Sequence, residues 1–376
     1  MDLDAPTALL AGLSPAQFMR RHWQRKPLLV RAAWPHVGSP VTRTQLFALA
    51  ADADVESRLV VRNGSQWSVR HGPLPRRSLP PLRQPGWTLL VQGVDLHADE
   101  AHRMLCAFRF VPDARLDDLM VSYASDGGGV GPHVDAYDVF LLQLRGTRRW
   151  CVGRMRDKRC VEGAPLKLLR RFEPRHDWLL EPGDMLYLPP DWGHDGIAVG
   201  ECMTASIGFR VPRDAELAQA MLLSVADALA DAHDDGGLAY RDRGSAATAT
   251  PARIPPALQA FARGAWAQAL RDPRTLPRAL GQWLSEPKPR VWFAPGRRAS
   301  GFGKLALVLD RRTRMLYDAG HVYINGEALP VSGRDSQCLR RLADERSLSP
   351  ADRRRLSPGA RTIVLQWLGS GWVHER

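Results

Sequence analysis

Two segments that each end in metal-ligand side chains constrain the fold of this chain more than any other feature. The segment GGGVGPHVD (Gly127–Asp135) carries His133 and Asp135 two residues apart, so on a strand both side chains point to the same face. The segment GDMLYLPPDWGH (Gly183–His194) contains a turn, an apolar strand, a proline stop and then His194. These three side chains can meet only if strands from distant parts of the sequence face one cavity.

His133, Asp135 and His194 are the candidate metal ligands. Two imidazoles and one carboxylate on one face of an octahedron leave three positions open, which suits a non-haem Fe(II) that must bind a bidentate co-substrate and dioxygen. A structural zinc site is closed and usually uses thiolates. The cysteines are odd in number and lack a CxxC pair, which argues against structural zinc and a disulfide framework (Cys106, Cys151, Cys160, Cys202 and Cys338). The pattern favours an open iron site over chance histidines on a core strand.

A buried cation is predicted to face the same interior. If the segment after Gly146 is a strand, Arg148, Trp150 and Val152 share its apolar, inward face. A buried arginine without an anionic partner is costly, and a bidentate carboxylate is its natural partner. Arg148 is therefore the candidate anchor for a carboxylate co-substrate such as 2-oxoglutarate, with an internal ion pair as the alternative. Arg149 lies on the opposite, solvated face.

Short apolar runs broken by Gly, Pro and Asp indicate a mainly β region between about residues 89 and 211. Nearer the N-terminus, a helix start at Ser14 leads to a short strand ending at Val30. This spacing suits a closed or sandwiched antiparallel barrel, with a turn at Arg145-Gly146. The candidate strands of the barrel are Leu89–Val91, Leu119–Ser122, Val139–Leu142, Trp150–Val152, Met185–Leu188 and Ala205–Phe209.

The pattern changes to helical periodicity after the β region. It predicts helices over Asp214–Asp231, from Leu258 to Leu270 and over Leu276–Leu284, with a loop at Asp234–Pro256. Packing against a second copy and packing against the barrel are both open for this region. Further on, alternating leucines predict a strand near Leu307, and the Asn-Gly turn at residues 325–326 predicts a hairpin. Leu339 and Leu342 suggest a short helix, so the end of the chain is winged-helix-like.

The net charge of +12 comes almost entirely from arginine, because only five of the 52 basic residues are lysines. A basic surface suits RNA, but no RNA-binding aromatic motif interleaves the arginines, so direct nucleic-acid binding stays open. No apolar run approaches the ~20 residues that span a bilayer. Acidic residues stand where a secretory signal would carry basic ones, so we expect a cytoplasmic protein that does not enter a membrane.

These segments resemble the JmjC-type ribosomal oxygenases, in particular the bacterial ribosomal protein arginine hydroxylases. Arg115–Met120, Gly127–Trp150 and Pro182–His194 carry the resemblance, and Phe18–Val30 is similar to the opening of that family. The resemblance implies an α+β fold: a double-stranded β-helix (JmjC/cupin jelly roll), a helical dimerisation region and a C-terminal winged-helix-like module. We expect the oxygenase domain at residues 1–212 (core about 89–211), the helical region at 213–286 and the winged-helix-like domain at 287–376.

The resemblance also implies cofactors, a substrate and an assembly. His133, Asp135 and His194 would hold Fe(II), Arg148 would anchor 2-oxoglutarate, and O2 would be the oxidant. The reaction would hydroxylate an unactivated side-chain carbon of a ribosomal protein. Bacterial relatives act on an arginine of large-subunit protein L sixteen and eukaryotic ones on ribosomal histidines, so a homodimer that hydroxylates a ribosomal arginine is expected.

A guanidinium substrate would need a carboxylate and an aromatic wall. Asp118, with Asp117 as its alternative, and Tyr137 are candidates, because Tyr137 is two residues past Asp135 and hence predicted on the same strand face. Ser206 and Met120 complete the predicted substrate-binding set. The alternative readings are a surface or turn position for Asp118 and a core position for Tyr137.

Other functions fit the sequence less well. A ribosomal histidine hydroxylase would share the metal site. A cupin-fold isomerase acting on a phosphosugar would normally need a further His or Glu ligand beside His133 and Asp135. A non-enzymatic RNA-associated regulator would not need to retain three ligands and Arg148. Conversion of 2-oxoglutarate to succinate that is lost in His133→Ala separates the oxygenases from both other classes.

Overall fold

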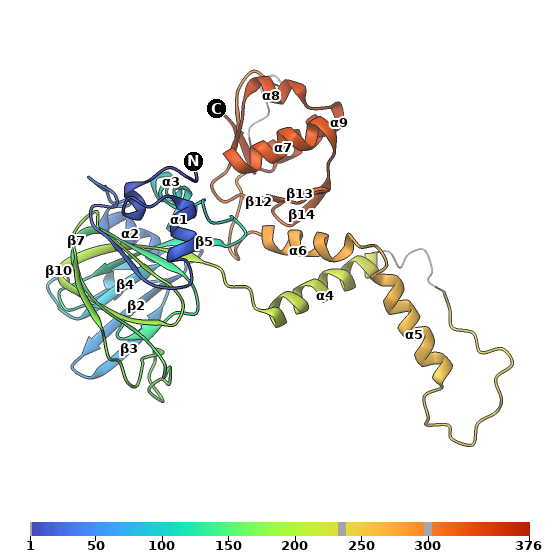
Figure 1. The fold of residues 1–376 in the computed structure, drawn as a ribbon, viewed down its shortest axis with the longest axis horizontal. Helices are drawn as coiled ribbons and strands as arrows, with labels where there is room; N and C mark the ends of the chain where they lie inside the picture. The colour runs from blue at the N-terminus through green and yellow to red at the C-terminus, as the bar shows by residue number, and fades with distance from the viewer. Residues whose placement is uncertain (1, 232–237, 297–302) are drawn as a thin grey trace. The chain divides into compact units, whose positions relative to one another are not determined.

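The computed structural model describes residues 2–231, 238–296 and 303–376 of the chain. It divides into two compact units, Met1–Val211 and Pro212–Arg376. The first unit is mainly β and the second mainly α (Figure 1).

The first unit holds the predicted β region and extends it toward the N-terminus. Its elements, in chain order, are η1 (Ala8–Leu10), α1 (Pro15–Arg21), β1 (Leu28–Val30), α2 (Arg43–Ala50), β2 (Ser57–Asn63), β3 (Gln66–His71), η2 (Arg76–Ser78), β4 (Trp87–Val91), η3 (Val94–Leu96), α3 (Asp99–Cys106), β5 (Leu116–Ala124), β6 (His133–Val134), β7 (Val139–Arg154), β8 (His176–Leu180), β9 (Met185–Leu188) and β10 (Trp192–Phe209).

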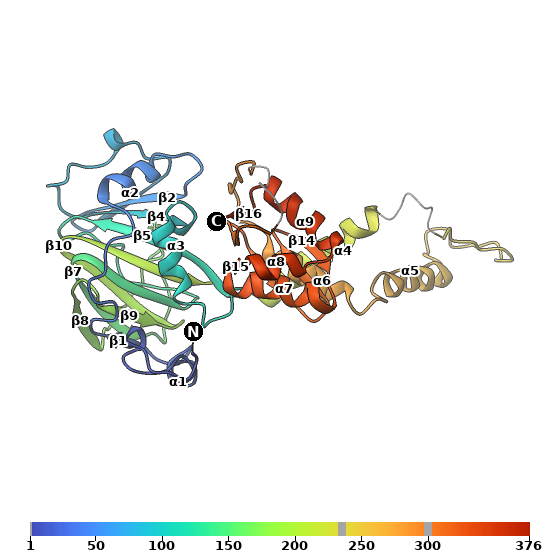
Figure 2. The ribbon, with the colours of Figure 1, turned by 90° about the horizontal axis from the view of Figure 1, so that it is seen from above.

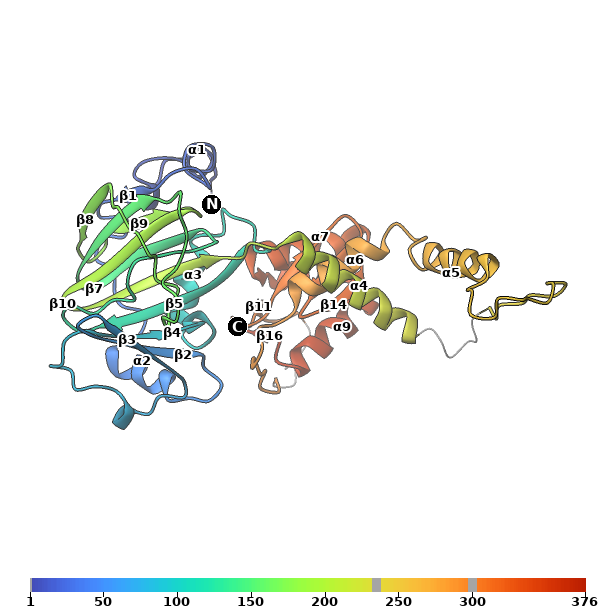
Figure 3. The same cartoon turned by 90° about the horizontal axis from the view of Figure 1, so that it is seen from below.

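Two long strands, β7 and β10, form the centre of the first unit. The strand order is β1-β9-β7-β10-β5-β4-β2-β3, with β6 paired to β10 and β8 paired to β7. Figure 3 shows β2 and β3 at one edge and β1, β8 and β9 at the other. The first half of β7 pairs with β9 and the second half with β8, so one long strand holds two shorter strands along the same edge. All of these pairings are antiparallel, as in a double-stranded β-helix.

The predicted turn at Arg145-Gly146 is wrong. The chain continues there as one strand, and β7 joins the two strands that were expected on either side. Gly146 has a φ of +64°, a value that glycine adopts readily. The register between β7 and β10 shifts nearby, between Val199 and Met203, so the glycine marks a bulge in a continuous ladder.

The N-terminal segment is fastened to the barrel by an aromatic core. Ser14 and Gln17 form the predicted capping box at the start of α1. Phe18 on this helix is fully buried and packs edge-on against Tyr187 of β9, with 4.9 Å between the ring centroids. The Tyr187 hydroxyl donates to Asp138 at 2.6 Å and accepts from the backbone N–H of Gln24 at 2.8 Å. Helix and barrel therefore share one hydrophobic core.

A second fastening holds the end of β1. Asp184, in the turn before β9, accepts hydrogen bonds from the backbone N–H groups of Ala32 (2.9 Å) and Glu181 (3.1 Å). It also pairs with the Arg31 guanidinium at 2.6 Å. Strand β1 is itself paired to β9, so this carboxylate adds a second connection between the segment that follows β1 and the turn that precedes β9.

Helices α2 and α3 lie on the same side of the first unit as α1 (Figure 2). Helix α2 contacts β4, and α3 contacts β5 and η3. Their buried residues, including Leu46, Phe47 and Met104, join the same hydrophobic core as Phe18. The opposite face of β4 and β5 does not contact these helices and lines a cavity.

The second unit contains the predicted helices and a small mixed module. Its elements are α4 (Asp214–Asp231), α5 (Pro256–Ala269), α6 (Thr275–Ser285), β11 (Leu307–Leu309), β12 (Met315–Tyr317), β13 (His321–Ile324), β14 (Glu327–Pro330), α7 (Gly333–Glu345), β15 (Ser347–Leu348), α8 (Pro350–Arg355), α9 (Pro358–Gly369) and β16 (Val373–Glu375).

The C-terminal part of the second unit has its own core. Apolar residues of β11, β13, α7 and α9 pack together, among them Leu307, Leu342 and Val364. Strands β13 and β14 form the predicted hairpin around Asn325-Gly326. Of the predicted Asp234–Pro256 loop, residues 234–237 lie outside the described residues, and no helix or strand is found over 238–255. In the parts of the chain that the structure covers, no helix is long and apolar enough to cross a membrane.

Asp184→Asn is predicted to destabilise the first unit by roughly 1–3 kcal/mol near pH 7, because an amide accepts weaker hydrogen bonds and forms no ion pair. Burial raises the pKa of the Asp184 carboxyl, but the N–H donors of Ala32, Glu181 and Arg31 outweigh burial and lower it overall. The carboxylate therefore stabilises the fold above the unfolded-state pKa of about 3.9 and stops doing so as the pH falls through the lower folded-state value.

Chemical denaturation of both proteins between about pH 7 and pH 3 tests this linkage. The difference in unfolding free energy between the wild type and Asp184→Asn should decrease as the pH falls. A difference that stays constant over this range would contradict it. Asp177→Asn is the control, because Asp177 is exposed and its ion pair with Arg149 lies on the surface, where such pairs contribute little.

Candidate active site

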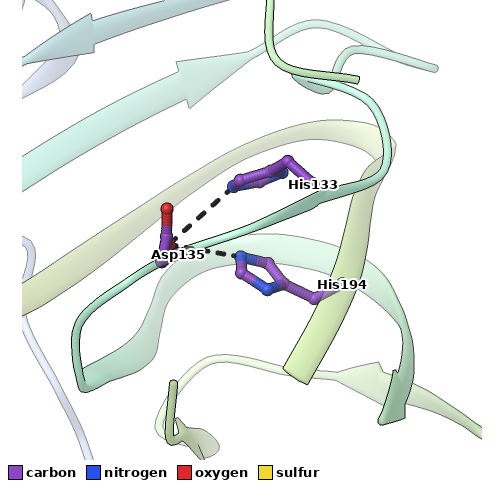
Figure 4. Close-up of side chains that lie close together, drawn as sticks. All are labelled: His133, Asp135 and His194. Carbon is purple, nitrogen blue, oxygen red and sulfur yellow. Dashed lines mark ion pairs between the residues drawn. The ribbon is translucent and has the colours of Figure 1, made fainter. Parts of the chain in front are cut away.

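The three candidate metal ligands converge at the end of β6. Strands β6 and β10 pair so that His133 lies directly opposite His194, and Asp135 follows just after β6. Asp135 Oδ2 lies 3.9 Å from His133 Nε2 and 3.6 Å from His194 Nε2. Figure 4 shows the three side chains pointing toward one another. Ligand atoms on one octahedral ion lie about 3 Å apart, so a small side-chain adjustment closes this group around a metal.

Backbone carbonyls orient both imidazoles. His133 Nδ1 lies 2.9 Å from the carbonyl oxygen of Gly131, and His194 Nδ1 lies 3.1 Å from that of Trp192. A carbonyl oxygen only accepts, so each Nδ1 carries the proton and each Nε2 keeps its lone pair toward Asp135. Burial lowers the pKa of His194 to about 4, so its ring is neutral near pH 7, the form that binds a metal.

Glycine is required where the loop before His133 touches β10. A Cβ on Gly129 would lie 2.6 Å from the carbonyl oxygen of Gly196, which is two residues past His194 on β10. Gly131 has a φ of +76°, in the left-handed region that favours glycine. The loop can therefore pass β10 in direct backbone contact, and this contact keeps His133 opposite His194.

Arg148 is buried in the same cavity, as its inward position on β7 predicted. Only 4% of the residue is exposed, whereas the neighbouring Arg149 is exposed and paired with Asp177. Its Nη1 donates to Ser122 Oγ (3.2 Å) and Thr204 Oγ1 (3.3 Å), and its Nη2 donates to the carbonyl of Gly196 (3.2 Å). All of these partners are neutral.

The Arg148 guanidinium also lies 5.2 Å from the ring centroid of Trp150. Its Nε is buried without a hydrogen-bond partner, and among the described residues no carboxylate forms an ion pair with it. Burial lowers the pKa of this guanidinium, which reflects the free energy of holding a charge away from water. A buried cation without a compensating charge can be stabilised by a bound anion.

One cavity of about 540 Å³ contains the metal-ligand group, Arg148 and all four predicted substrate residues. Asp118 and Met120 come from β5 and Ser206 from β10, where Ser206 pairs with Met120. Asp118 is 6% exposed and accepts a hydrogen bond from the backbone N–H of Gly93 at 3.0 Å. Its alternative, Asp117, also lines the cavity, but it lies 3.4 Å from Arg210 in an ion pair.

Tyr137 reaches the cavity for a different reason from the one predicted. It lies in a bend between β6 and β7, not on a strand with Asp135. The bend still directs its ring into the cavity, and 41% of the residue is exposed there. Burial and the negative charges of Asp135 and Asp118 raise the pKa of Tyr137, so its hydroxyl stays protonated and can donate.

Sequence reasoning missed the cavity wall that β2 and β4 form. Arg58 on β2 and Thr88 on β4 line the cavity, as does Gln92, which follows β4. The strands β2 and β3 themselves were not predicted, although Asn63-Gly64 joins two runs of alternating residues and is a hairpin signal. The hydroxyl partners of Arg148, Ser122 and Thr204, were also missed, because no local pattern places residues of β5 and β10 beside β7.

Two protein families match the chain. One is the JmjC domain, over residues 103–217, and the other is the ROXA-like winged helix, over residues 268–374. The ribosomal protein uL16 3-hydroxylase of Escherichia coli (strain K12) is 35% identical over 279 residues, which cover 74% of this chain and 73% of that protein. The probable ribosomal oxygenase of Haemophilus influenzae is 37% identical over 205 residues, which cover 53% and 50%.

Solved structures agree with these matches. The X-ray structure of E. coli YcfD superposes with a TM-score of 0.81 at 30% identity, covering 96% of this chain and 98% of that one. The ribosomal oxygenase YcfD in complex with cobalt and 2-oxoglutarate superposes with a TM-score of 0.78 at 30% identity, again covering 96% and 98%. These likenesses confirm the predicted α+β class, with a JmjC/cupin barrel and a winged helix. The predicted domain boundaries remain predictions.

Proposed function

This chain belongs to the JmjC-type ribosomal oxygenases, and on that premise we propose that it hydroxylates an arginine side chain of the large-subunit ribosomal protein uL16. The reaction would use Fe(II), 2-oxoglutarate and O2, and would take place in the cytoplasm. The observation that carries the proposal is the buried Arg148 guanidinium, which has no carboxylate partner among the residues that the structure describes and lines the cavity of the metal-ligand group.

His133, Asp135 and His194 are proposed to hold the iron. The donor set fits Fe(II), because two neutral imidazoles and a carboxylate occupy one side of the ion and leave positions for further ligands. With 2-oxoglutarate and O2 bound, the metal supplies the oxidant that inserts oxygen into a C–H bond, while 2-oxoglutarate becomes succinate and CO2. The carbonyls of Gly131 and Trp192 hold both rings in the tautomer that this ligation needs.

Arg148 is proposed to bind the distal carboxylate of 2-oxoglutarate. A carboxylate would neutralise its charge, and the unpartnered Nε offers a donor for it. The hydroxyls of Ser122 and Thr204 lie 3.2 and 3.3 Å from the guanidinium and would fix the orientation of its plane. The E. coli relative has been solved with cobalt and 2-oxoglutarate, which supports the same pairing of metal and co-substrate.

Asp118 and Tyr137 are proposed to hold the substrate guanidinium, with Met120 and Ser206 beside them. Asp118 supplies a negative charge with little exposure to solvent, where an ion pair is screened less than on the surface. Tyr137 adds an aromatic face. An arginine substrate satisfies this carboxylate better than a neutral histidine would, which favours the arginine over the histidine assignment. The name of the E. coli relative supports uL16 as the protein substrate.

The exposed apolar faces of α4 and α5 support a homodimer. Leu222 and Leu223 of α4 are 47% and 58% exposed, and Phe261 and Trp266 of α5 are 38% and 50% exposed. Among the described residues helix α5 has no buried position, and Phe261 contacts the ring of Tyr240 at a centroid distance of 5.5 Å but stays exposed. A second copy of the chain would cover these exposed side chains, as in a symmetric oligomer.

Arg148→Met is predicted to raise the KM for 2-oxoglutarate at least about 100-fold in the turnover of 2-oxoglutarate to succinate, because it removes the buried cation. Arg149→Met is the matched control and should leave KM unchanged. Thermal unfolding gives a second measurement: 2-oxoglutarate should raise the Tm of the wild type but not of Arg148→Met. His133→Ala should abolish turnover. An unchanged KM in Arg148→Met would refute the co-substrate assignment.

Mass spectrometry of ribosomal proteins tests the substrate. Protein uL16 from cells that carry the gene should contain an arginine heavier by one oxygen atom, and the gene deletion should remove this mass. Purified chain added to uL16 from the deletion strain should restore it, while the His133→Ala chain should not. A modified arginine that persists in the deletion strain would overturn the substrate but leave the oxygenase chemistry standing.

Phe261→Glu combined with Trp266→Glu is predicted to convert the dimer into a monomer, because two charges would be buried in an apolar contact. Light scattering at micromolar concentration measures the mass, and circular dichroism checks that the helices persist. Arg263→Glu, an exposed change on the same helix, should leave the dimer intact. A monomeric wild type would contradict the proposed dimer.

A further inference from the structure

In the part of the cavity wall that β2 and β4 form, three buried polar atoms have no hydrogen-bond partner within the described part of the chain. They are Arg58 Nε, Thr88 Oγ1 and Gln92 Oε1. All three residues line the cavity that contains the metal-ligand group. Buried polar atoms are nearly always hydrogen-bonded, and leaving one unpaired is destabilising, so each such atom requires an explanation. A bound ligand that pairs with them is one.

Arg58 and Gln92 lie next to each other on this wall. In the β2–β4 ladder Arg58 is directly opposite Leu90, and Gln92 is two residues past Leu90 on the same face. The ladder extends to Gln92, whose backbone N–H donates to the carbonyl of Glu56 at 2.9 Å. Such diagonal neighbours have Cβ atoms roughly 7–8 Å apart, within reach of one small group between two long side chains.

Thr88 belongs to the other end of the wall. It pairs with Val60 and Ala124, and a Cβ on Gly128 would lie 3.1 Å from its hydroxyl, in the loop before His133. Gln92, by contrast, is followed by Gly93, whose N–H donates to Asp118. The Arg58–Gln92 pair is therefore adjacent to the proposed guanidinium site, and Thr88 is not part of it.

We propose that Arg58 and Gln92 bind a main-chain peptide group of the substrate, next to the residue whose side chain Asp118 holds. This inference rests on the proposed function, because it requires a protein substrate. Arg58 offers a cationic donor and Gln92 an unpaired acceptor, and a peptide group carries one C=O and one N–H to match them. A carboxylate ligand would satisfy Arg58 but would place an acceptor against Gln92 Oε1.

The charges fix the direction in which the substrate lies. Arg58 repels a guanidinium, whereas Asp118 attracts it, so the side chain of a substrate arginine points to Asp118 and its backbone to β2 and β4. Contacts of this kind recognise the backbone and leave the neighbouring side chains free to vary. The wall then distinguishes a residue within a polypeptide from free arginine.

Binding of uL16 peptides to the full chain, loaded with metal and 2-oxoglutarate under nitrogen, tests the proposal. Each peptide is centred on the unmodified arginine at the position that the enzyme oxidises. In a matched series the peptide nitrogens are N-methylated one at a time. Arg58→Met and Gln92→Leu should each weaken binding of the unmodified peptide about 10-fold or more, without changing the KM for 2-oxoglutarate. Arg62→Met is the control, because Arg62 is on the same strand but stacks on Trp67 outside the cavity.

The N-methylated series makes the test specific to the main chain. One methylation should weaken binding to the wild type about as much as Gln92→Leu does, and should weaken binding to Gln92→Leu no further. Equal losses in both proteins at every position would overturn the proposal. So would a loss in Arg58→Met confined to peptides with a neighbouring Asp or Glu, which would indicate a carboxylate subsite.

The failure of the proposed substrate has a different signature. A wild type that turns over 2-oxoglutarate but binds no uL16 peptide would overturn both the substrate and this inference. A wild type that hydroxylates the peptide, while Arg58→Met and Gln92→Leu bind it equally well, would overturn the inference alone. Tighter binding of free arginine amide to the wild type than to Arg58→Met, on the other hand, would support recognition of a peptide-like group.

Discussion

The pairing of β10 with β5, β6 and β7 is the constraint on which the rest of the site depends. Along one strand, His194 lies opposite His133, Ala198 lies opposite Arg148, and Ser206 lies opposite Met120. A slip of one residue would turn every side chain of β10 to the other face. The proposed metal ligands, anion site and substrate site therefore all depend on how this one strand pairs with its neighbours, and Gly129 lets the loop before His133 contact the strand at Gly196.

The cavity separates two kinds of charge that its ligands must match. It is lined both by a cation, Arg148, which donates to neutral hydroxyls and a carbonyl, and by the carboxylate of Asp118. Arg148 has no acidic ion-pair partner among the described residues. The fold thus carries unfavourable electrostatic free energy that bound ligands relieve, as functional sites commonly do. These buried charges lower the stability of the unliganded fold.

Much of the site could be predicted from the sequence because its chemistry is local. The spacing of His133 and Asp135 and the strand that leads to His194 specify a shared face, and the apolar neighbours of Arg148 specify its inward direction. The wall of β2 and β4 could not be found in this way, because Arg58 and Gln92 become partners only through a sheet register between distant segments. The prediction of a turn at Arg145-Gly146 was wrong for a related reason. A glycine between two strands indicates a turn and a bulge equally well, and only the pairing of β7 with β10 shows that this one is a bulge.

The place of β10 in the chain has a consequence for how the protein is made. Synthesis proceeds from the N-terminus, so β5, β6 and β7 emerge while the strand that completes their ladders is still untranslated. Until residue 194 is released, only two of the three ligands exist, and the inner edges of the sheet stay unpaired. The proposed three-ligand site is therefore complete only after residue 194 has emerged, later than β5, β6 and β7.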